Sequence, residues 1–299
     1  MAEGVNRYGK VVYWENIGFL ILTHLLAGVA IYYSWAYVFS WKTIALAVVW
    51  YYCCSLSISA GYHRLFAHRS YKCSNIVRFF HLAFGAASWQ SSALNWASDH
   101  RDHHAYTDDE GDPYNIKKGF WWAHWGWLCY RPTHSDFNHA KDLKDSRLVS
   151  FQDRHYFSWA LLFGILLPML IAWTWQDAVG AFLWVGWFRL LIQYHATFSI
   201  NSVAHWVGTQ PYSTATSARD SLTAAVLTMG EGYHNYHHRF PSDYRNGIRF
   251  YHWDPSKWAI WCWSKMGLAW DLKQIPDEAI EKAKEAVKQG QAEKIEAVV

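Results

Sequence analysis

The chain has 299 residues, of which 52% are hydrophobic and 19% aromatic, and its 21 tryptophans are typical of a protein at a membrane–water interface. The formal charge of +3 comes without a run of lysine or arginine, which argues against a nucleic-acid-binding surface. The five cysteines have no CxxC spacing and include the adjacent pair Cys53 and Cys54, which argues against a disulfide framework and a cysteine-ligated zinc site.

Most of the apolar residues fall in segments that are predicted to span a membrane. The polar sequence before Ile17 does not resemble a signal peptide, so we expect the first hydrophobic segment to remain in the protein. Crossing a bilayer takes about 20 residues of helix. Four stretches meet this requirement: 17–39, 43–62, 156–176 and 178–204. Because the first two and the last two are separated by very short connections, we expect two tight helical hairpins.

Two further segments are predicted as helices outside the bilayer core. Residues 79–98 carry no charge but contain several amide and hydroxyl side chains, which favours a helix at the membrane interface. Residues 277–299 are typical of a short charged helix with Ile280, Ala283 and Val287 on one face, either docked or loose.

The distribution of positive charge predicts which side of the membrane carries the larger part of the chain. Two hairpins leave the N-terminus, residues 63–155 and residues 205–299 on one side. Lysine and arginine are frequent in 63–155, whereas Lys42 stands alone in the short opposite loops, and this places the larger side in the cytoplasm. We therefore expect an all-α integral membrane protein, a single domain over 1–299, with four transmembrane helices in two hairpins and a helical cytoplasmic cap. A bacterial inner membrane or the endoplasmic reticulum would hold it.

Histidines gather in four boxes at the cytoplasmic ends of the predicted spans. The boxes are HRLFAH with His63 and His68, HRDHH with His100, His103 and His104, NSVAH with Asn201 and His205, and HNYHH with His234, His237 and His238. On a helix, residues three and four apart lie on one face, so each HxxHH box is expected to turn three imidazoles toward one centre. Chance surface histidines would rarely give two such boxes. The other eight histidines lack this spacing and are expected to be ordinary packed or exposed residues.

The number of histidines in the boxes predicts two metal ions. Nine imidazoles and one amide exceed the roughly four to six positions around a single metal. Nitrogen ligands with open positions favour a pair of irons that activates O2, although zinc binds such sites more tightly than Fe²⁺ and can replace iron in isolated protein. Asp99, Asp102 and Glu231 lie beside the boxes, and we expect some of them to accept the free imidazole N–H, ordinary surface carboxylates being the alternative.

Together with their flanking sequences, the boxes resemble those of a known family. The segments DHRDHHAYTDDEGDPYN and GEGYHNYHHRFPSDYR, with HxxxxH and NxxxH, look like the membrane fatty-acid desaturases, specifically the stearoyl-CoA, or acyl-CoA Δ9, desaturase type. The resemblance covers roughly residues 10–273. It implies a mushroom-shaped fold with four spans, a dinuclear iron centre and a kinked acyl tunnel. By position in the motifs, the iron ligands would be His63, His68, His100, His103, His104, His205, His234, His237 and His238, with Asn201 through water.

The resemblance also implies positions that bind the substrate. Gln90, Trp96 and Thr197 match residues that shape the bend where the double bond is made, while Asn16 and Arg131 match positions that touch the CoA head group.

At the CoA positions the sequence also departs from the family. Glu15 stands where the family often has a basic residue, and Pro132 replaces a second cation, which implies a weaker grip on the CoA phosphates or a different acyl carrier. Lys117 and Lys118 are candidates to compensate, a solvated charge pair being the default interpretation.

The activity that the resemblance implies is O2-dependent desaturation of a long-chain fatty acyl-CoA, giving a cis double bond at Δ9. A di-iron membrane hydroxylase acting on a lipid or alkane chain is the alternative. A metal transporter fits less well, because the boxes lie at the ends of the spans and not near the bilayer centre. The chain shows no cytochrome b5, ferredoxin or dinucleotide-binding motif, so we expect an external electron donor of the cytochrome b5, ferredoxin or rubredoxin type.

The length of the second span predicts where an acyl tunnel ends. If the ninth carbon of a stearoyl chain lies near His63, the remaining carbons extend along about seven or eight residues of helix at roughly 1.5 Å each. This distance reaches back to Ser55. Tyr51 and Tyr52 stand one turn before it, and we expect one of these two rings to limit the chain length.

Overall fold

The structure is a computed structural model that describes residues 11–130 and 138–290. Within these ranges, three helices are long and apolar enough to cross a membrane, namely Trp14–Ala36, Trp41–Ala67 and Tyr156–Trp173. The first is α1 (Trp14–Ala36), and the second is α2 (Trp41–Leu56) continued by the π-helix η1 (Ser57–Ala67). The third consists of α8 (Tyr156–Leu161), the π-helix η5 (Leu162–Leu166) and α9 (Leu167–Trp173).

The stretch predicted as a fourth span is also helical. It comprises α10 (Ala178–Ala181), the π-helix η6 (Phe182–Phe188) and α11 (Arg189–Ser202). It is not among the three apolar helices, so a fourth span remains a prediction. The guanidinium of Arg189 is buried, and it donates to the carbonyl oxygens of Val185 and Ala87 and to Gln193 Oε1. These hydrogen bonds compensate for burying the charged side chain of Arg189 within an otherwise apolar stretch of helix.

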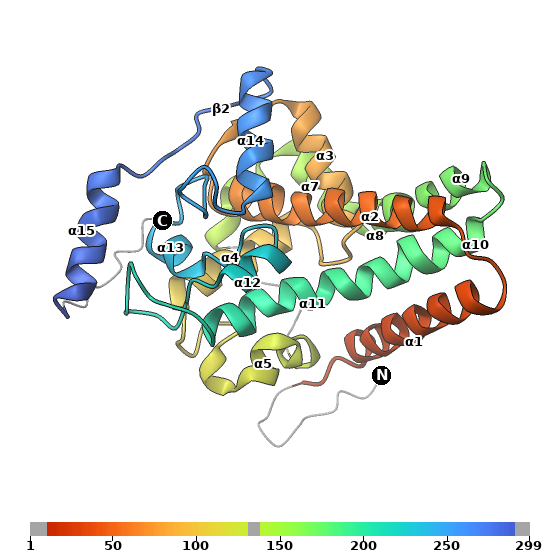
Figure 1. Cartoon of the computed structure of the whole chain (residues 1–299), viewed down its shortest axis with the longest axis horizontal. Helices are drawn as coiled ribbons and strands as arrows, with labels where there is room; N and C mark the ends of the chain where they lie inside the picture. The colour runs from red at the N-terminus through yellow and green to blue at the C-terminus, as the bar shows by residue number, and fades with distance from the viewer. Residues whose placement is uncertain (1–10, 131–137, 291–299) are drawn as a thin grey trace.

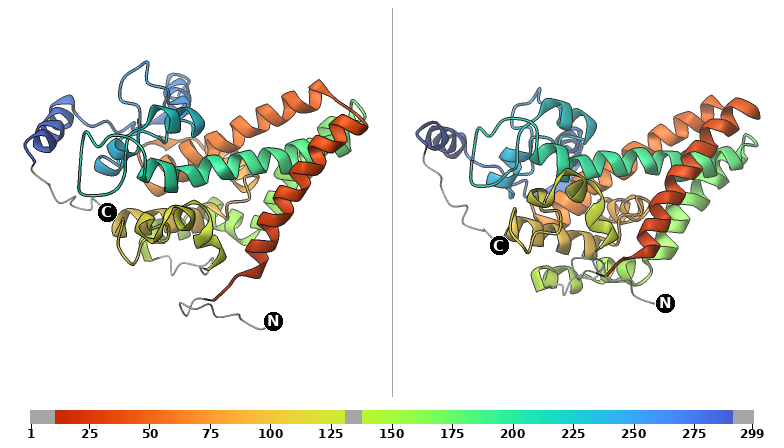
Figure 2. Two further views of the ribbon diagram at one scale, coloured as in Figure 1. Left: turned by 60° about the horizontal axis from the view of Figure 1, so that its bottom comes forward. Right: turned by 90° about the horizontal axis from the view of Figure 1, so that it is seen from below.

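The α1–α2 and α9–α10 connections lie at the same end of the molecule, away from the broader cap, and from there α1 diverges from α2 and α11 (Figures 1 and 2). At that end Asp177 accepts hydrogen bonds from Thr43, Tyr33 and the backbone N–H of Gly180. One buried carboxylate thus ties the two connections together. The pairing of the helices as two membrane hairpins stays a prediction.

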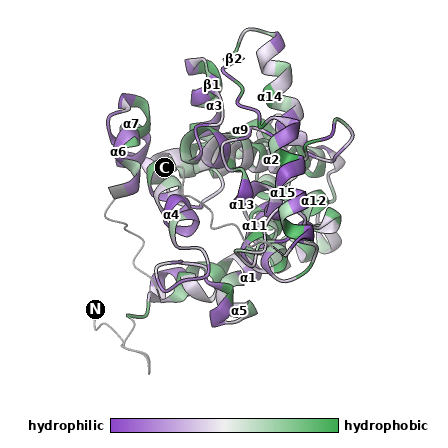
Figure 3. Ribbon diagram, turned by 90° about the vertical axis from the view of Figure 1, so that its left-hand side faces the viewer, coloured by the Kyte–Doolittle hydropathy of each residue, from purple (hydrophilic) through white to green (hydrophobic). Residues whose placement is uncertain are grey.

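The cap contains the shorter helices and one small sheet, and its outer end carries hydrophilic stretches on α4 and α15 (Figure 3). Its helices are α3 (Asn75–Ala86), α4 (Ala93–Tyr106), α5 (Phe120–His124), α6 (Lys141–Lys144), α7 (Arg147–Arg154), α12 (Leu222–Leu227), α13 (His234–Arg239), α14 (Pro255–Lys265) and α15 (Asp277–Lys288). The 3-10 turns are η2 (Ile116–Lys118), η3 (Gly126–Cys129), η4 (Asn138–Ala140) and η7 (Val203–His205). Strand β1 (Lys72–Cys73) pairs antiparallel with β2 (Ala269–Trp270).

The prediction of one interfacial helix over 79–98 is wrong, because α3 ends at Ala86 and α4 begins at Ala93. Between them Trp89 (φ 53°) and Ser91 (φ 74°) adopt left-handed backbone conformations, which residues with a Cβ rarely do and which a helix cannot contain. Ser92 then accepts the N–H of Asn95 and caps α4. The turn is what directs α4, with its three histidines, into the cap.

Other predictions for the cap and the termini are confirmed. Helix α15 buries Ile280 and Ala283, and Ile280 packs with Tyr212 and Tyr236, so its apolar face is docked. All five cysteines are free, as expected from their spacing.

Candidate metal centre

Nine imidazoles from four elements meet in the cap and form two groups. The five-histidine cluster contains His63, His68, His100, His104 and His237, and the four-histidine cluster contains His103, His205, His234 and His238. In each cluster one nitrogen from every ring lies within 4.8 Å of the others, which makes both groups able to hold a metal ion. These are all nine of the histidines that the boxes singled out.

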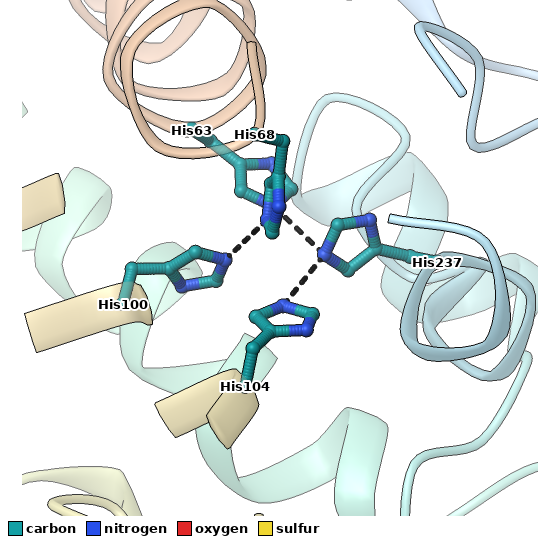
Figure 4. A group of neighbouring side chains, drawn as sticks. All are labelled: His63, His68, His100, His104 and His237. Carbon is teal, nitrogen blue, oxygen red and sulfur yellow. Dashed lines mark hydrogen bonds between the residues drawn. The ribbon is translucent and has the colours of Figure 1, made fainter. Parts of the chain in front are cut away.

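The rings of the five-histidine cluster point their Nε2 atoms at a common centre (Figure 4). The Nε2–Nε2 distances are 3.0 Å from His63 to His237, 2.9 Å from His68 to His100 and 2.9 Å from His104 to His237. His63 comes from the π-helical end of the second apolar helix and His68 caps it. π-Helical turns are frequent at functional sites.

The four-histidine cluster has the same kind of geometry. Its Nε2–Nε2 distances are 3.3 Å from His103 to His238, 3.0 Å from His205 to His234 and 3.1 Å from His234 to His238. The two clusters are neighbours, because the rings of His104 and His238 stack with centroids 4.4 Å apart.

Each HxxHH box divides its histidines between the clusters, and the expectation of three imidazoles toward one centre is wrong. In α4, His100 and His104 enter the five-histidine cluster and His103 enters the other; in α13, His234 and His238 go together and His237 goes apart. Adjacent positions on an α-helix are rotated by about 100°, so consecutive histidines cannot face one point, whereas residues four apart nearly can. Each HxxHH box therefore contributes histidines to both clusters.

Contacts at Nδ1, the ring nitrogen that faces away from the cluster, orient the rings of His63, His103 and His205. Nδ1 of His63 lies 2.9 Å from Glu231 Oε2, and Nδ1 of His103 lies 2.8 Å from Asp112 Oδ1. A neutral imidazole carries one N–H, and a carboxylate accepts it, so the Nε2 lone pair faces the cluster. Nitrogen lone pairs that converge in this way suit a first-row transition metal.

His205 is held through a longer chain. Its Nδ1 lies 2.7 Å from Ser217 Oγ, which in turn donates to Asp108 Oδ1 at 2.6 Å. The backbone N–H of Asp108 donates to Asp112 Oδ2, so one acidic loop after the HRDHH box supports both His103 and His205.

The predicted carboxylate partners are partly corrected by these contacts. Glu231 holds a box histidine as expected. Asp102 instead lies 2.6 Å from Nδ1 of His139, which belongs to neither cluster, and Asp99 lines the neighbouring cavity. Asp112 was missed, although the acidic run after HRDHH was a signal for it. Ser217 lies far from every box in the sequence, and no local pattern pointed to it.

Burial sets the protonation states of the clusters. Burial lowers the pKa of the imidazoles well below its ordinary value, and neighbouring histidines lower it further; the affected residues are His68, His100, His104, His205, His234, His237 and His238. For Glu231, burial alone would raise the pKa, but His63, Arg64 and Ser59 together bring the pKa below its ordinary value. These seven imidazoles are therefore neutral, the form that binds metals, and they lie near an ionised carboxylate.

A cavity of about 190 Å³ borders the five-histidine cluster at His100. Its lining is rich in Trp, Tyr and Phe side chains. It includes four of the predicted substrate-binding residues and the predicted water-bridged ligand: Asn16, Gln90, Trp96, Thr197 and Asn201. Trp96 Nε1 donates to Gln90 Oε1 at 3.4 Å, and Gln90 Nε2 donates to Thr197 Oγ1 at 3.0 Å. The predicted bend residues thus form one hydrogen-bonded chain. Arg131 and Pro132 lie outside the described residues.

A second, smaller cavity of about 30 Å³ shares Thr197 with the first. Tyr51, Ser55 and Ile58 line it from the second apolar helix. Tyr52 does not line it, and 49% of its side chain is exposed on the outside of the helix. Of the two tyrosines proposed to end the tunnel, Tyr51 lines one of these two cavities and Tyr52 lines neither.

Comparison with known proteins adds independent information. The family model described as fatty acid desaturase matches residues 34–261. The chain is 41% identical over 275 residues to the probable acyl-CoA desaturase of Schizosaccharomyces pombe, covering 90% of this chain and 57% of that one. It is 43% identical over 244 residues to acyl-CoA desaturase 1 of Saccharomyces cerevisiae (80% and 48%), and 35% identical over 286 residues to the stearoyl-CoA desaturase of Homo sapiens (91% and 77%). The chain spans about half the length of the two yeast relatives.

Proposed function

The chain belongs to the fatty acid desaturase family, and from this membership and the site we propose that it desaturates a long-chain fatty acyl-CoA with O2, placing a cis double bond at Δ9. The observation that carries the proposal is the apolar cavity that runs directly against the five-histidine cluster at His100. Its relatives carry the names acyl-CoA desaturase and stearoyl-CoA desaturase, which supports the same substrate class.

The nine histidines would hold two irons, one in each cluster, with Asn201 as a ligand through water. Bound there, the irons would supply the oxidising power to remove hydrogens from an unactivated methylene, which no side chain supplies. The all-nitrogen donor set fits iron and also zinc, so zinc is the expected substitute in isolated protein. Glu231, Asp112 and Ser217 keep the ligand rings oriented and in the metal-binding tautomer.

The walls of the cavity would position the acyl chain. The indole of Trp96 stacks on His100 with ring centroids 5.0 Å apart, so a chain that passes Trp96 lies beside the five-histidine cluster. The Trp96–Gln90–Thr197 hydrogen bonds satisfy the polar groups at this point and hold the wall in place. A fixed wall places one carbon–carbon bond next to the metal site, which is the geometric requirement for regioselective reaction.

The three apolar helices and the family make this a membrane protein. We place the site on the cytoplasmic side of a bacterial inner membrane or of the endoplasmic reticulum, with α10 to α11 as a fourth span. Asn16, Arg131 and the Lys117–Lys118 pair would contact the CoA. An external donor of the cytochrome b5, ferredoxin or rubredoxin type would approach His68 and His104, the two partly exposed members of the five-histidine cluster.

The proposal is tested by anaerobic loading of the purified protein with iron and a reductant, followed by O2 and stearoyl-CoA. Mass spectrometry of the released acyl chain should show loss of two hydrogens and a cis double bond at carbon 9. A product that has gained oxygen without losing hydrogens would identify a hydroxylase and contradict the proposal.

A further inference from the structure

An open groove of about 670 Å³ lies away from the histidine clusters, between the start of α3 and the α6–α7 segment. Arg78 and Phe79 line it from α3, and Asp145, Arg147 and Leu148 line it from the other side. None of these residues takes part in the proposed metal centre or in the acyl cavity. The groove therefore needs its own explanation.

Aromatic contacts place the groove at the level of the membrane surface. The ring of Phe79 is 46% exposed, and its centroid lies 5.3 Å from that of Trp159 and 6.1 Å from that of Phe163. Trp159 belongs to the first turn of the apolar helix Tyr156–Trp173. Aromatic rings gather where such helices leave the hydrocarbon. Ile76, one turn before Phe79, is 74% exposed and continues this apolar rim.

The groove has an excess of positive charge when the partners of its acidic residues are counted, because Arg69, Arg78, Arg101 and Arg147 stand against Asp142 and Asp145. Arg78 lies near the thiol of Cys73, and its Nε is buried without a hydrogen-bond partner among the described residues. Arg147 is exposed at the start of α7. Two arginines that line one groove beside an apolar rim match the junction between a phosphate and its acyl chains.

The acidic residues of the groove do not cancel this charge. Asp142 is already shared by Arg69 and Arg101, whose nearest nitrogens lie 2.9 Å and 2.6 Å from Asp142 Oδ1. Asp145 is the remaining carboxylate at the rim. It disfavours a headgroup with several negative charges, so a single phosphodiester fits best.

We propose that this groove binds the phosphodiester of an acidic membrane phospholipid, with Arg78 and Arg147 on the phosphate and the acyl chains along Ile76 and Phe79. Guanidinium groups bind phosphate oxygens with paired, charge-assisted hydrogen bonds. The net positive charge selects an acidic lipid over a zwitterionic one. The site depends on the membrane location of the chain and is independent of the proposed activity.

Native mass spectrometry of the full chain, released from mixed phosphatidylcholine and phosphatidylglycerol micelles, tests the proposal. The wild-type protein should retain phosphatidylglycerol preferentially. The double variant Arg78→Gln/Arg147→Gln should bind it about tenfold more weakly or worse, because both charge-assisted contacts are lost. Arg147→Gln alone changes an exposed side chain, so it keeps the fold and should show part of the loss.

Arg154→Gln is the matched control, because it removes the same charge from the same helix without altering the groove lining. It should bind phosphatidylglycerol like the wild type. Unchanged binding in the double variant, an equal loss in Arg154→Gln, or equal retention of phosphatidylcholine by the wild type would each overturn the proposal.

Discussion

The atoms behind the imidazoles decide whether a histidine cluster can bind a metal at all. His103 can offer the lone pair of Nε2 to a metal only while Nδ1 carries the proton. Asp112 Oδ1, 2.8 Å from Nδ1, accepts a hydrogen bond from that N–H and so stabilises this tautomer. Asp112 also accepts the backbone N–H groups of Asp108 and Tyr114, so its own position is fixed by the loop. A single carboxylate thereby orients a ring and stabilises the loop that supports His205.

Replacing this carboxylate should weaken the four-histidine site selectively. In Asp112→Asn, the amide no longer provides two full acceptor oxygens, and we expect metal affinity to fall by about 10- to 100-fold. Competition with a chelator, read by metal analysis, measures the change. Asp109→Asn is the control, since Asp109 is exposed three residues away. Equal metal retention in the two variants would show that Asp112 does not position His103.

Removing a cluster histidine should abolish turnover without removing the protein from the membrane. His104→Ala or His237→Ala deletes a ring from the five-histidine cluster, whereas the apolar helices that insert the chain are untouched. We expect loss of product and a lower metal content. His155→Ala, which removes an exposed histidine outside both clusters, should keep most of the activity. Comparable metal content and rate in His104→Ala and His155→Ala would refute the ligand assignment.

At the level of elements, the start of α13 is held by the half-buried carboxylate of Asp220, which lies in the segment before α12. Asp220 Oδ1 accepts the N–H groups of Asn235 at 2.8 Å and Tyr236 at 3.1 Å, both in the first turn of α13. The start of a helix leaves such N–H groups without partners in the helix. Because α13 holds His234, His237 and His238, the direction of its first turn sets both clusters at once.

Asp220→Ala should therefore lower both stability and metal content. Loss of a helix-capping acceptor costs about 0.5–2 kcal/mol of unfolding free energy. Asp220→Asn keeps the acceptor oxygen and should retain both, as measured by thermal unfolding and metal analysis. A normal metal content in Asp220→Ala would show that α13 is fixed by its other contacts.

Comparing Asp220→Asn with the wild-type protein also tests how stability depends on pH. Burial raises the pKa of Asp220 to about 7, so the folded protein holds this proton more tightly than the unfolded chain. Stability from this group is then greatest at low pH and falls as the pH rises toward about 7. The stability difference between Asp220→Asn and the wild type should move in favour of Asn over this range. A difference that stays constant with pH would contradict the raised pKa.

The elements also show what the sequence could predict. Apolar length predicted the three membrane helices to within a few residues at most ends, because that signal is local. The break at Trp89 and Ser91 was missed, since two left-handed non-glycine residues have no sequence signature and are imposed by packing. The boxes identified which histidines meet, but their division between two clusters depends on how α4 and α13 face each other. The bond from Ser217 to His205 depends on a loop that only the folded chain brings near.

On the scale of the whole molecule, the cavities run from the cap into the membrane helices. The larger one contacts His100 and the smaller one reaches Tyr51 on α2, with Thr197 lining both. Catalysis and the choice of acyl-chain length would therefore depend on different parts of the chain. The cap would hold the metals, and we expect the depth available between α2 and α11 to limit the acyl chain.

Tyr51 and Tyr52 form a matched pair for testing this division. Both are tyrosines on α2 and their rings touch edge to face at 5.5 Å, but only Tyr51 lines the smaller cavity, while Tyr52 is exposed. Tyr51→Ala should open space beyond Thr197 and raise kcat/KM for stearoyl-CoA relative to palmitoyl-CoA and myristoyl-CoA. Tyr52→Ala should leave the ratios unchanged, because its ring occupies no tunnel volume. If Tyr51→Ala does not favour the longer chain, or if Tyr52→Ala shifts the ratio equally, the acyl chain ends elsewhere and α2 does not measure its length.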